Sequence, residues 1–106
     1  MQIVVTGGLG AVGAPLTREL RERGHEVWVA DRVHAPGPNY LRCDVGIHRQ
    51  VERLFEEGRR FDLVYHLAAE FGRWNGEDFY ETLWQSNAIG TKNMIRAQEK
   101  YGFRMV

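Results

Sequence analysis

The sequence has no excess of one charge and no long apolar stretch, and each absence excludes a class of protein. Fourteen Lys and Arg residues balance fourteen Asp and Glu residues, whereas nucleic-acid binding normally requires a basic excess gathered on one face. Ile3-Val4-Val5 is typical of the longest apolar runs, whereas a membrane span needs roughly 20 such residues. We therefore expect no nucleic-acid partner and no membrane partner.

A secretion signal is also missing from the start of the sequence. Met1 leads almost directly into a strand-like run, without the charged and apolar regions of a signal peptide. Of the 106 residues, 43% are hydrophobic and 26% are charged, as in an ordinary globular domain. These features predict one cytoplasmic domain.

Residues that could hold a metal are few and scattered. Cys43 is the only cysteine, so the chain can form neither an internal disulfide nor a paired-cysteine metal site. The four histidines lack the spacing of metal ligands. We therefore predict no metal centre.

What the sequence does contain is an alternation of strand-like and helix-like segments. Residues 2–6 are mostly apolar and β-branched, as in a buried parallel strand. Residues 12–23 carry apolar side chains at helical spacing, and Gly24 follows where a helix would end. Residues 26–30 predict a second strand with Asp31 at its carboxyl end. Together these segments form one β-α-β unit.

The alternation continues more loosely through the rest of the sequence. Further strands are expected at residues 40–42 and 61–67, and residues 103–106 resemble the opening of a fifth strand. Helices are expected around Val51 and over residues 79–101. Because parallel strands need crossover connections, this order predicts an α/β fold with a doubly wound parallel sheet, truncated at the start of its fifth strand.

Glycines are concentrated between the first strand and the first helix. Two spacings overlap there, Gly8-x-Gly10-x-x-Gly13 and Gly7-x-x-Gly10-x-x-Gly13. One glycine permits a tight turn out of the strand, one lets the backbone approach a pyrophosphate, and the last lets the helix pack close to the sheet. The N–H groups at the start of the helix would then face the phosphates. The alternative interpretation is a tight strand-to-helix turn without a ligand.

Asp31 favours the interpretation as a dinucleotide site. It lies about eighteen residues after Gly13, where a carboxylate can accept hydrogen bonds from both hydroxyls of an adenosine ribose. The same charge would repel a 2′-phosphate, which favours NAD over NADP. Arg32 leaves NADP binding as an alternative, because its guanidinium could instead hold that phosphate.

Two further features lie later in the sequence. The strand over residues 61–67 leads into Ala68 and Ala69, whose small side chains would leave room for the ribose and nicotinamide of the cofactor. Helix packing would equally explain such small residues. Asn87 falls on the inner stripe of the helix over residues 79–101, where a buried amide must find partners. In the alternative, the helix is rotated and Asn87 is exposed.

Together these residues resemble the extended short-chain dehydrogenase/reductase family, and more narrowly its NAD-dependent epimerase/dehydratase branch. The resemblance covers essentially the whole sequence. It rests on the joint occurrence of Thr6-Gly7-x-x-Gly10-x-x-Gly13, Asp31, Asp44-Val45, His66-Leu67-Ala68-Ala69 and Asn87-x-x-Gly90-Thr91.

The resemblance implies a set of NAD-binding residues at the carboxyl ends of the strands. The glycine loop would hold the pyrophosphate, the acid after the second strand and the arginine beside it would hold the adenosine ribose, and the Asp-Val pair would lie against the adenine. The alanine pair would flank the nicotinamide, and Asn87 matches the family's structural active-site asparagine. The implied set is Gly7, Leu9, Gly10, Ala11, Val12, Gly13, Asp31, Arg32, Asp44, Val45, Leu67, Ala68, Ala69 and Asn87.

The resemblance also implies a function. Most members of that branch act on nucleotide sugars by transient hydride transfer to bound NAD, and their helices often pair in homodimers. Their catalytic Tyr-x-x-x-Lys lies beyond the fifth strand and has no counterpart in this sequence. We therefore assign no catalytic residue and expect residues 1–106 to be the N-terminal part of an NAD-binding Rossmann domain, inactive without the catalytic segment and the substrate domain. Phe71 to Trp74 would border the sugar.

Two other functions stay open at this point. One is another oxidoreductase of the extended family, such as a reductase of a small hydroxy compound. The other is a module that senses the dinucleotide without catalysis.

Overall fold

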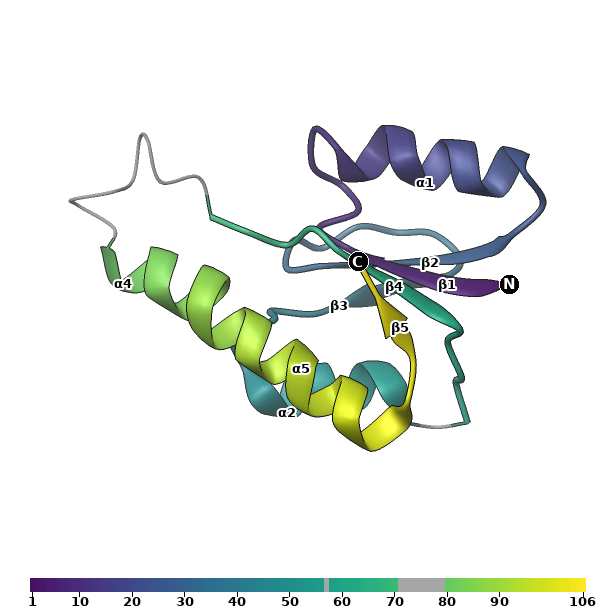
Figure 1. Ribbon diagram of the computed structural model, residues 1–106. Coiled ribbons are helices and arrows are strands. Elements are labelled where there is room, and N and C mark those ends of the chain that lie inside the picture. The colour runs from purple at the N-terminus through teal and green to yellow at the C-terminus, as the bar shows by residue number, and fades with distance from the viewer. Residues whose placement is uncertain (57, 71–79) are drawn as a thin grey trace.

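Within the described residues, five parallel strands form one sheet in the order β3-β2-β1-β4-β5 (Figure 1). The computed structural model describes residues 1–56, 58–70 and 80–106. The order places β1 in the centre, so that the chain winds to one side of it first and to the other side afterwards. The strands are β1 (Gln2–Thr6), β2 (Glu26–Asp31), β3 (Tyr40–Arg42), β4 (Leu63–His66) and β5 (Arg104–Met105).

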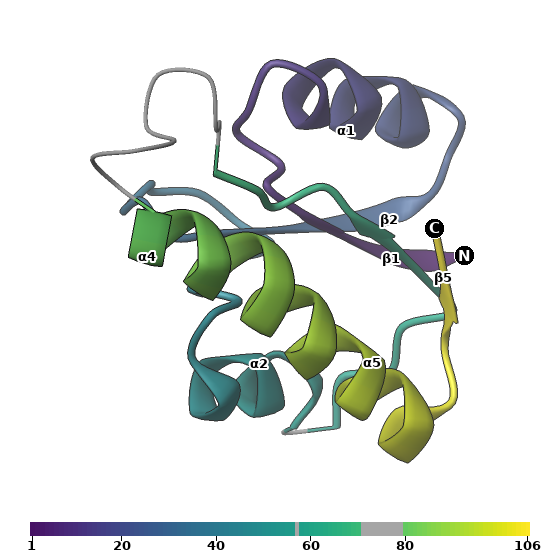
Figure 2. The ribbon, with the colours of Figure 1, turned by 60° about the vertical axis from the view of Figure 1, so that its left-hand side comes forward.

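Helices cover both faces of this sheet. The helix α1 (Gly13–Glu22) lies over one face, and α2 (His48–Phe55) and α5 (Gly90–Tyr101) lie over the other (Figure 1, Figure 2). Before α5 come α4 (Tyr80–Leu83) and the π-helical stretch η1 (Trp84–Ile89). In the part of the chain that the structure describes, no helix combines the length and the apolar character needed to cross a membrane.

Burial on both faces explains why β1 reads as a continuous apolar run. Ile3 and Val5 pack with Leu20 of α1, whereas Val4 packs on the opposite face with Met94 of α5. All three β1 side chains have 0% exposure, and each fully buried side chain of this kind contributes about 1.5–3 kcal/mol. The carboxyl end of β1 is therefore held in a fixed position between the two helical layers.

The predicted fold class is confirmed, because all four strand pairings are parallel and helices lie between the strands. The strands expected at residues 2–6 and 40–42 match β1 and β3, and other boundaries differ by one or two residues. The strand predicted over residues 61–67 is β4 (Leu63–His66). The helix predicted over residues 12–23 is α1, for which Val12 is the N-cap.

The inner stripe predicted for the last helix is wrong in its phase. The π-helical turns of η1 are wider than α-helical ones, so they rotate the residues before Gly90 relative to those after it. Asn87 is exposed, as in the alternative that the sequence left open, and Phe79, from which the helix was expected to start, lies outside the described residues. The positions that are buried along η1 and α5 are Ser86, Gly90, Asn93, Met94 and Ala97.

Candidate functional site

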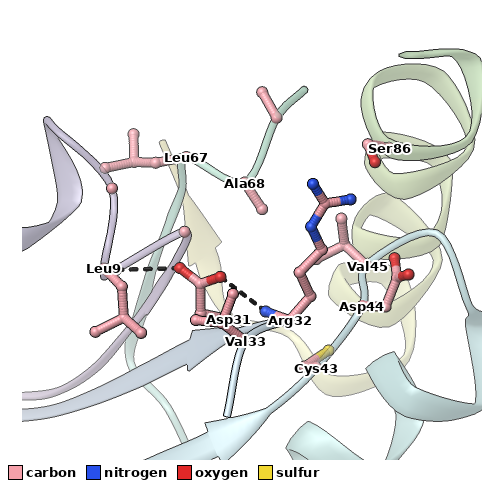
Figure 3. A pocket seen from close by; sticks show the side chains of 13 residues that line it. Leu9, Asp31, Arg32, Val33, Cys43, Asp44, Val45, Leu67, Ala68 and Ser86 are labelled. Carbon is pink, nitrogen blue, oxygen red and sulfur yellow. Dashed lines mark hydrogen bonds between the residues drawn. The ribbon is translucent and has the colours of Figure 1, made fainter. Parts of the chain in front are cut away.

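A cavity of about 330 Å³ opens at the carboxyl ends of the central strands (Figure 3). The winding of the chain reverses there, because β2 and β4 flank β1 on its two sides. Open α/β sheets bind their ligands at such a reversal. The cavity is lined by Gly7, Leu9, Gly10, Asp31, Arg32, Val33, Cys43, Asp44, Val45, Leu67, Ala68, Ala69 and Ser86.

The glycine loop forms one wall of the cavity with its backbone. Gly7 has a φ of +69° and donates its N–H to the Ala30 carbonyl at 2.8 Å. A Cβ atom on Gly7 would lie 2.8 Å from the Ala68 nitrogen. A Cβ atom on Gly13 would lie 2.2 Å from the Gly7 carbonyl oxygen. Contacts within the protein therefore require glycine at both positions.

Gly10 differs from these two glycines, because the space beside it belongs to the cavity. Among the described atoms within 4 Å, a Cβ on Gly10 would meet only the Gly7 carbonyl oxygen, at 3.2 Å. Gly10 also lines the cavity. Packing within the protein thus does not explain this glycine, whereas a ligand lying against the backbone would.

The loop leads into the amino end of α1, which no side chain of the described residues caps. Val12 is the N-cap and is 67% exposed. The Ala14 N–H donates to the Gly10 carbonyl at 3.0 Å, which fixes the loop against the first turn. Ala11, Val12 and Gly13 do not line the cavity. Ala11 and Val12 lead into α1, which begins at Gly13 and whose positive dipole end adjoins the loop.

Asp31 ends β2 and fastens the glycine loop to that strand. Its Oδ2 accepts the Leu9 N–H at 3.1 Å, and its Oδ1 accepts the Arg32 N–H at 2.8 Å (Figure 3). These two bonds fix the orientation of the carboxylate at the edge of the cavity. Because a carboxylate offers about four lone-pair sites, both oxygens can still accept hydrogen bonds from a ligand.

Arg32 and Glu70 connect the two sides of the cavity. The Arg32 Nη2 atom lies 2.7 Å from the Glu70 Oε2 atom. Arg32 follows β2 and Glu70 belongs to the segment after β4, so the pair bridges strands that β1 separates. The Arg32 side chain is 52% exposed and the Glu70 side chain 12%, so water screens the pair mainly from the side of the guanidinium.

Asp44 and Val45 form the side of the cavity away from the glycine loop (Figure 3), and the last helices hold them in place. Asn93 Nδ2 donates to the Val45 carbonyl at 2.8 Å in a buried hydrogen bond. Gln85 Nε2 donates to the Gly46 carbonyl. The position of this wall therefore depends on η1 and α5.

Replacing Asn93 with alanine is expected to lower the free energy of unfolding by about 1–3 kcal/mol, because the buried Val45 carbonyl would lose its partner. Asn93 is 3% exposed, so water cannot replace the amide without a rearrangement. Urea denaturation measures the difference. The control is Lys92→Ala at an exposed position of α5, expected within about 0.5 kcal/mol of the wild type. An Asn93→Ala variant as stable as the wild type would contradict the role of this bond.

Leu67 and Ala68 form a third side of the cavity, and Thr6 holds them. The fully buried Thr6 hydroxyl oxygen accepts the N–H groups of Leu67 at 3.1 Å and of Ala68 at 3.2 Å. It also lies 2.8 Å from Nδ1 of His66. His66 is half-buried, and this burial lowers the pKa of its imidazole.

Asn87 fastens the helical layer to the segment that follows β4. Its Oδ1 accepts the Glu70 N–H at 2.7 Å, and its Nδ2 donates to the Glu70 carbonyl at 3.1 Å. Asn87 does not line the cavity. The amide thus ties η1 to a neighbouring loop, although it does so from the surface and not from the predicted inner stripe.

The cavity gathers most of the predicted site residues and adds some that the sequence did not suggest. Val33, Cys43 and Ser86 also line it. Cys43 and Val33 adjoin predicted residues in the sequence, whereas Ser86 is a buried residue of η1 that no predicted residue pointed to. Burial and the neighbouring Asp44 raise the pKa of Cys43 to about 12, so its thiol stays protonated and is a poor nucleophile.

One prediction from the sequence cannot be compared with the structure. Phe71 to Trp74, expected to border the substrate, lie outside the described residues.

Comparison with known proteins agrees with this geometry. Residues 3–106 match the model of the NAD dependent epimerase/dehydratase family. The chain is 36% identical to the 2-alkyl-3-oxoalkanoate reductase of Stenotrophomonas maltophilia (strain K279a), over 96% of this chain and 31% of that protein. It is 32% identical to UDP-glucuronic acid decarboxylase 1 of Danio rerio, over 99% of this chain and 26% of that protein.

A solved structure shows the same arrangement. The UDP-glucose 4-epimerase of Thermus thermophilus, in complex with NAD, superposes with a TM-score of 0.84 at 29% identity, over 96% of this chain and 35% of that chain. The chain thus spans about a third or less of the length of the proteins that it matches.

Proposed function

Because this chain belongs to the NAD dependent epimerase/dehydratase family, we propose that it binds NAD and forms the cofactor-binding part of an enzyme that acts on a nucleotide sugar. NAD is the cofactor that the description of the family names. The nucleotide sugar is suggested by relatives such as the UDP-glucuronic acid decarboxylase.

The observation that carries the proposal is the pairing of an open glycine with a fixed carboxylate at one cavity. Gly10 lines the cavity, and a Cβ there would meet one protein atom, the Gly7 carbonyl oxygen at 3.2 Å, which fits a pyrophosphate lying against the loop. Asp31 presents both carboxylate oxygens at the end of the adjacent strand. This fits the two hydroxyls of an adenosine ribose. The residues present therefore fit the cofactor.

Each remaining wall of the cavity would contact a different part of the cofactor in the proposed complex. Asp44 and Val45 would lie against the adenine, and the segment from Leu67 to Ala69 would flank the ribose and the nicotinamide. Asn87 would hold the far end of that segment through Glu70. When bound, NAD supplies the acceptor for a hydride from the sugar. This chain contributes by orienting the cofactor and excluding water from its phosphates.

A second candidate function is the reduction or oxidation of a small oxo or hydroxy compound. The identity of 36% to the 2-alkyl-3-oxoalkanoate reductase favours it. Both candidates need the same cofactor site, so NAD binding supports either of them. Turnover of UDP-sugars against turnover of small 3-oxo acids, measured on the full-length protein, distinguishes the two.

Replacing Gly10 with alanine is expected to weaken NAD binding about tenfold with only a small loss of stability. The added methyl group would occupy the space of a phosphate oxygen, whereas its one protein contact, at 3.2 Å, requires the Gly7 carbonyl oxygen to shift slightly. A tenfold change corresponds to about 1.4 kcal/mol. Isothermal titration calorimetry with NAD measures the affinity, and circular dichroism on heating measures the stability.

The matched control for this experiment is Ala14→Ser, which adds one heavy atom at an exposed position of α1. It should bind NAD as the wild type does. Equal affinity of the Gly10→Ala variant and the wild type would place the pyrophosphate elsewhere. A wild type that does not bind NAD at all would overturn the proposed function itself.

A further inference from the structure

Three side chains, those of Thr6, His66 and Thr91, form a continuous series of polar contacts that ends at the Asn87 backbone carbonyl. His66 Nδ1 lies 2.8 Å from the Thr6 hydroxyl, and His66 Nε2 lies 3.4 Å from the Thr91 hydroxyl. The Thr91 hydroxyl donates to the Asn87 carbonyl at 2.7 Å. This series joins β1, β4, η1 and α5. His66 is its one member that titrates near neutral pH.

Two residues of the series, Thr6 and Asn87, also bind the two ends of the segment from residue 67 to residue 70. At one end the Thr6 hydroxyl oxygen binds the N–H groups of Leu67 and Ala68. At the other end the Asn87 amide binds the backbone of Glu70. Leu67 and Ala68 line the cavity, so the state of His66 is linked directly to the shape of one cavity wall.

The hydrogen bonds determine where the proton of His66 lies. A hydroxyl oxygen has two lone pairs, and at Thr6 these face the N–H groups of Ala68 and Leu67, the latter shared with the Thr6 carbonyl. The Thr6 O–H must then donate to Nδ1 of His66. Nδ1 is therefore an acceptor, and the proton of the neutral ring lies on Nε2, facing Thr91.

On the basis of the proposed function, we propose that His66 is a positioning residue of the cofactor site. As a neutral imidazole protonated on Nε2, it fixes the Thr6 hydroxyl, which holds the wall formed by Leu67 and Ala68. Protonation of Nδ1 releases this wall and weakens NAD binding. The imidazolium places an N–H donor opposite the Thr6 O–H donor. Thr6 can accept it only by giving up the Leu67 or the Ala68 N–H.

The surroundings of His66 do not compensate a positive charge. The groups that face it from β1 and α5 are the neutral hydroxyls of Thr6 and Thr91. Among the described residues no charged group shifts its pKa, and burial alone lowers that pKa below its ordinary value of about 6.5. The unfolded chain therefore binds the proton more readily than the folded chain. The contribution of the neutral His66 ring to the free energy of unfolding is fully present above about pH 6.5 and is lost as the pH falls through the pKa of the folded state.

The first test needs no cofactor. Long-range ¹H–¹⁵N spectra of the imidazole, recorded on the full chain from pH 8 to pH 4.5, report which nitrogen carries the proton and where the ring titrates. We expect the Nε2–H form at neutral pH and a titration midpoint below the ordinary histidine value of about 6.5. A ring protonated on Nδ1 at neutral pH, or a midpoint at or above that ordinary value, would overturn the proposal.

The second test follows the NAD dissociation constant over the same pH range. In the wild type it should rise, approaching tenfold for each pH unit below the folded pKa of His66. His66→Asn can present a carbonyl oxygen in place of Nδ1 and cannot titrate, so its dissociation constant should lack that rise. His66→Leu should bind more weakly at every pH, because the Thr6 O–H loses its acceptor. A His66→Asn variant with the wild-type rise would assign the effect to another group.

His34→Asn is the matched control, because His34 is exposed and lies outside the cavity. It should keep the pH dependence of the wild type. If NAD does not bind at all, the proposed function fails, whereas the spectra still decide the tautomer and the linkage of His66 to the fold. The two failures are therefore distinguishable.

Discussion

A Gly13→Ala variant is expected to lose about 3 kcal/mol of its free energy of unfolding. The new Cβ would lie 2.2 Å from the Gly7 carbonyl oxygen and 2.8 Å from the Gly8 Cα. Both neighbours are backbone atoms, which cannot move without displacing the loop from Ala68. Overpacking of this kind costs about 1–3 kcal/mol and sometimes more. Urea denaturation followed by circular dichroism measures the loss.

Whether Gly13→Ala lowers or raises the free energy of unfolding tests how closely the helix packs against the loop. In a helix without such a contact, exchanging glycine for alanine stabilises by about 0.5–1 kcal/mol. A gain in stability for Gly13→Ala would therefore mean that the helix does not pack closely against the loop. Gly10→Ala is the internal comparison, because its Cβ meets the same Gly7 oxygen at 3.2 Å instead of 2.2 Å and should cost less stability.

The largest expected effect on binding belongs to Asp31. Asp31→Ala should weaken NAD binding about a hundredfold, because each charge-assisted hydrogen bond to a ribose hydroxyl contributes about 1.5–3 kcal/mol, and about 2.7 kcal/mol corresponds to a hundredfold change. NADP binding should change less, because the lost carboxylate also repelled the 2′-phosphate. Calorimetric titration with both nucleotides measures the two dissociation constants.

Asp62 supplies the matched control for Asp31. Its carboxylate also accepts a backbone N–H, that of Gln2 at 2.8 Å, but it lies just before β4, at the opposite edge of the sheet. Asp62→Ala should change neither dissociation constant. An Asp31→Ala variant with an unaltered preference between NAD and NADP would show that this carboxylate does not hold the ribose.

The features that could be predicted from the sequence are those set by local patterns. The apolar run of β1 predicted its burial on both faces, because a strand covered on both sides has no polar alternation. The glycine spacing predicted the loop, since Gly7 and Gly13 meet backbone atoms a few residues away or on the adjoining strand. Asp31 could be placed because the carboxyl ends of parallel strands meet at one edge.

The features that could not be predicted depend on contacts between distant segments. Asn93 binds Val45 across 48 residues of sequence, and Thr6 reaches His66 across 60. Their residue types do not reveal these partners. The phase of the last helix was left open between an inner and an exposed Asn87, because a regular helical repeat of 3.6 residues assumes that no wider turn intervenes. In the structure Ser86 lines the cavity and Asn87 lies at the surface.

The way in which the segment after β4 is fastened leaves one place for variation. Thr6 binds the backbone of Leu67 and Ala68, and Asn87 binds the backbone of Glu70, so Ala69 lies between two hydrogen-bonded positions. Ala69 is exposed and borders the cavity. A larger or charged side chain introduced there would alter what the cavity admits without disturbing the scaffold. That position is therefore the natural starting point for redesigning the selectivity of this domain.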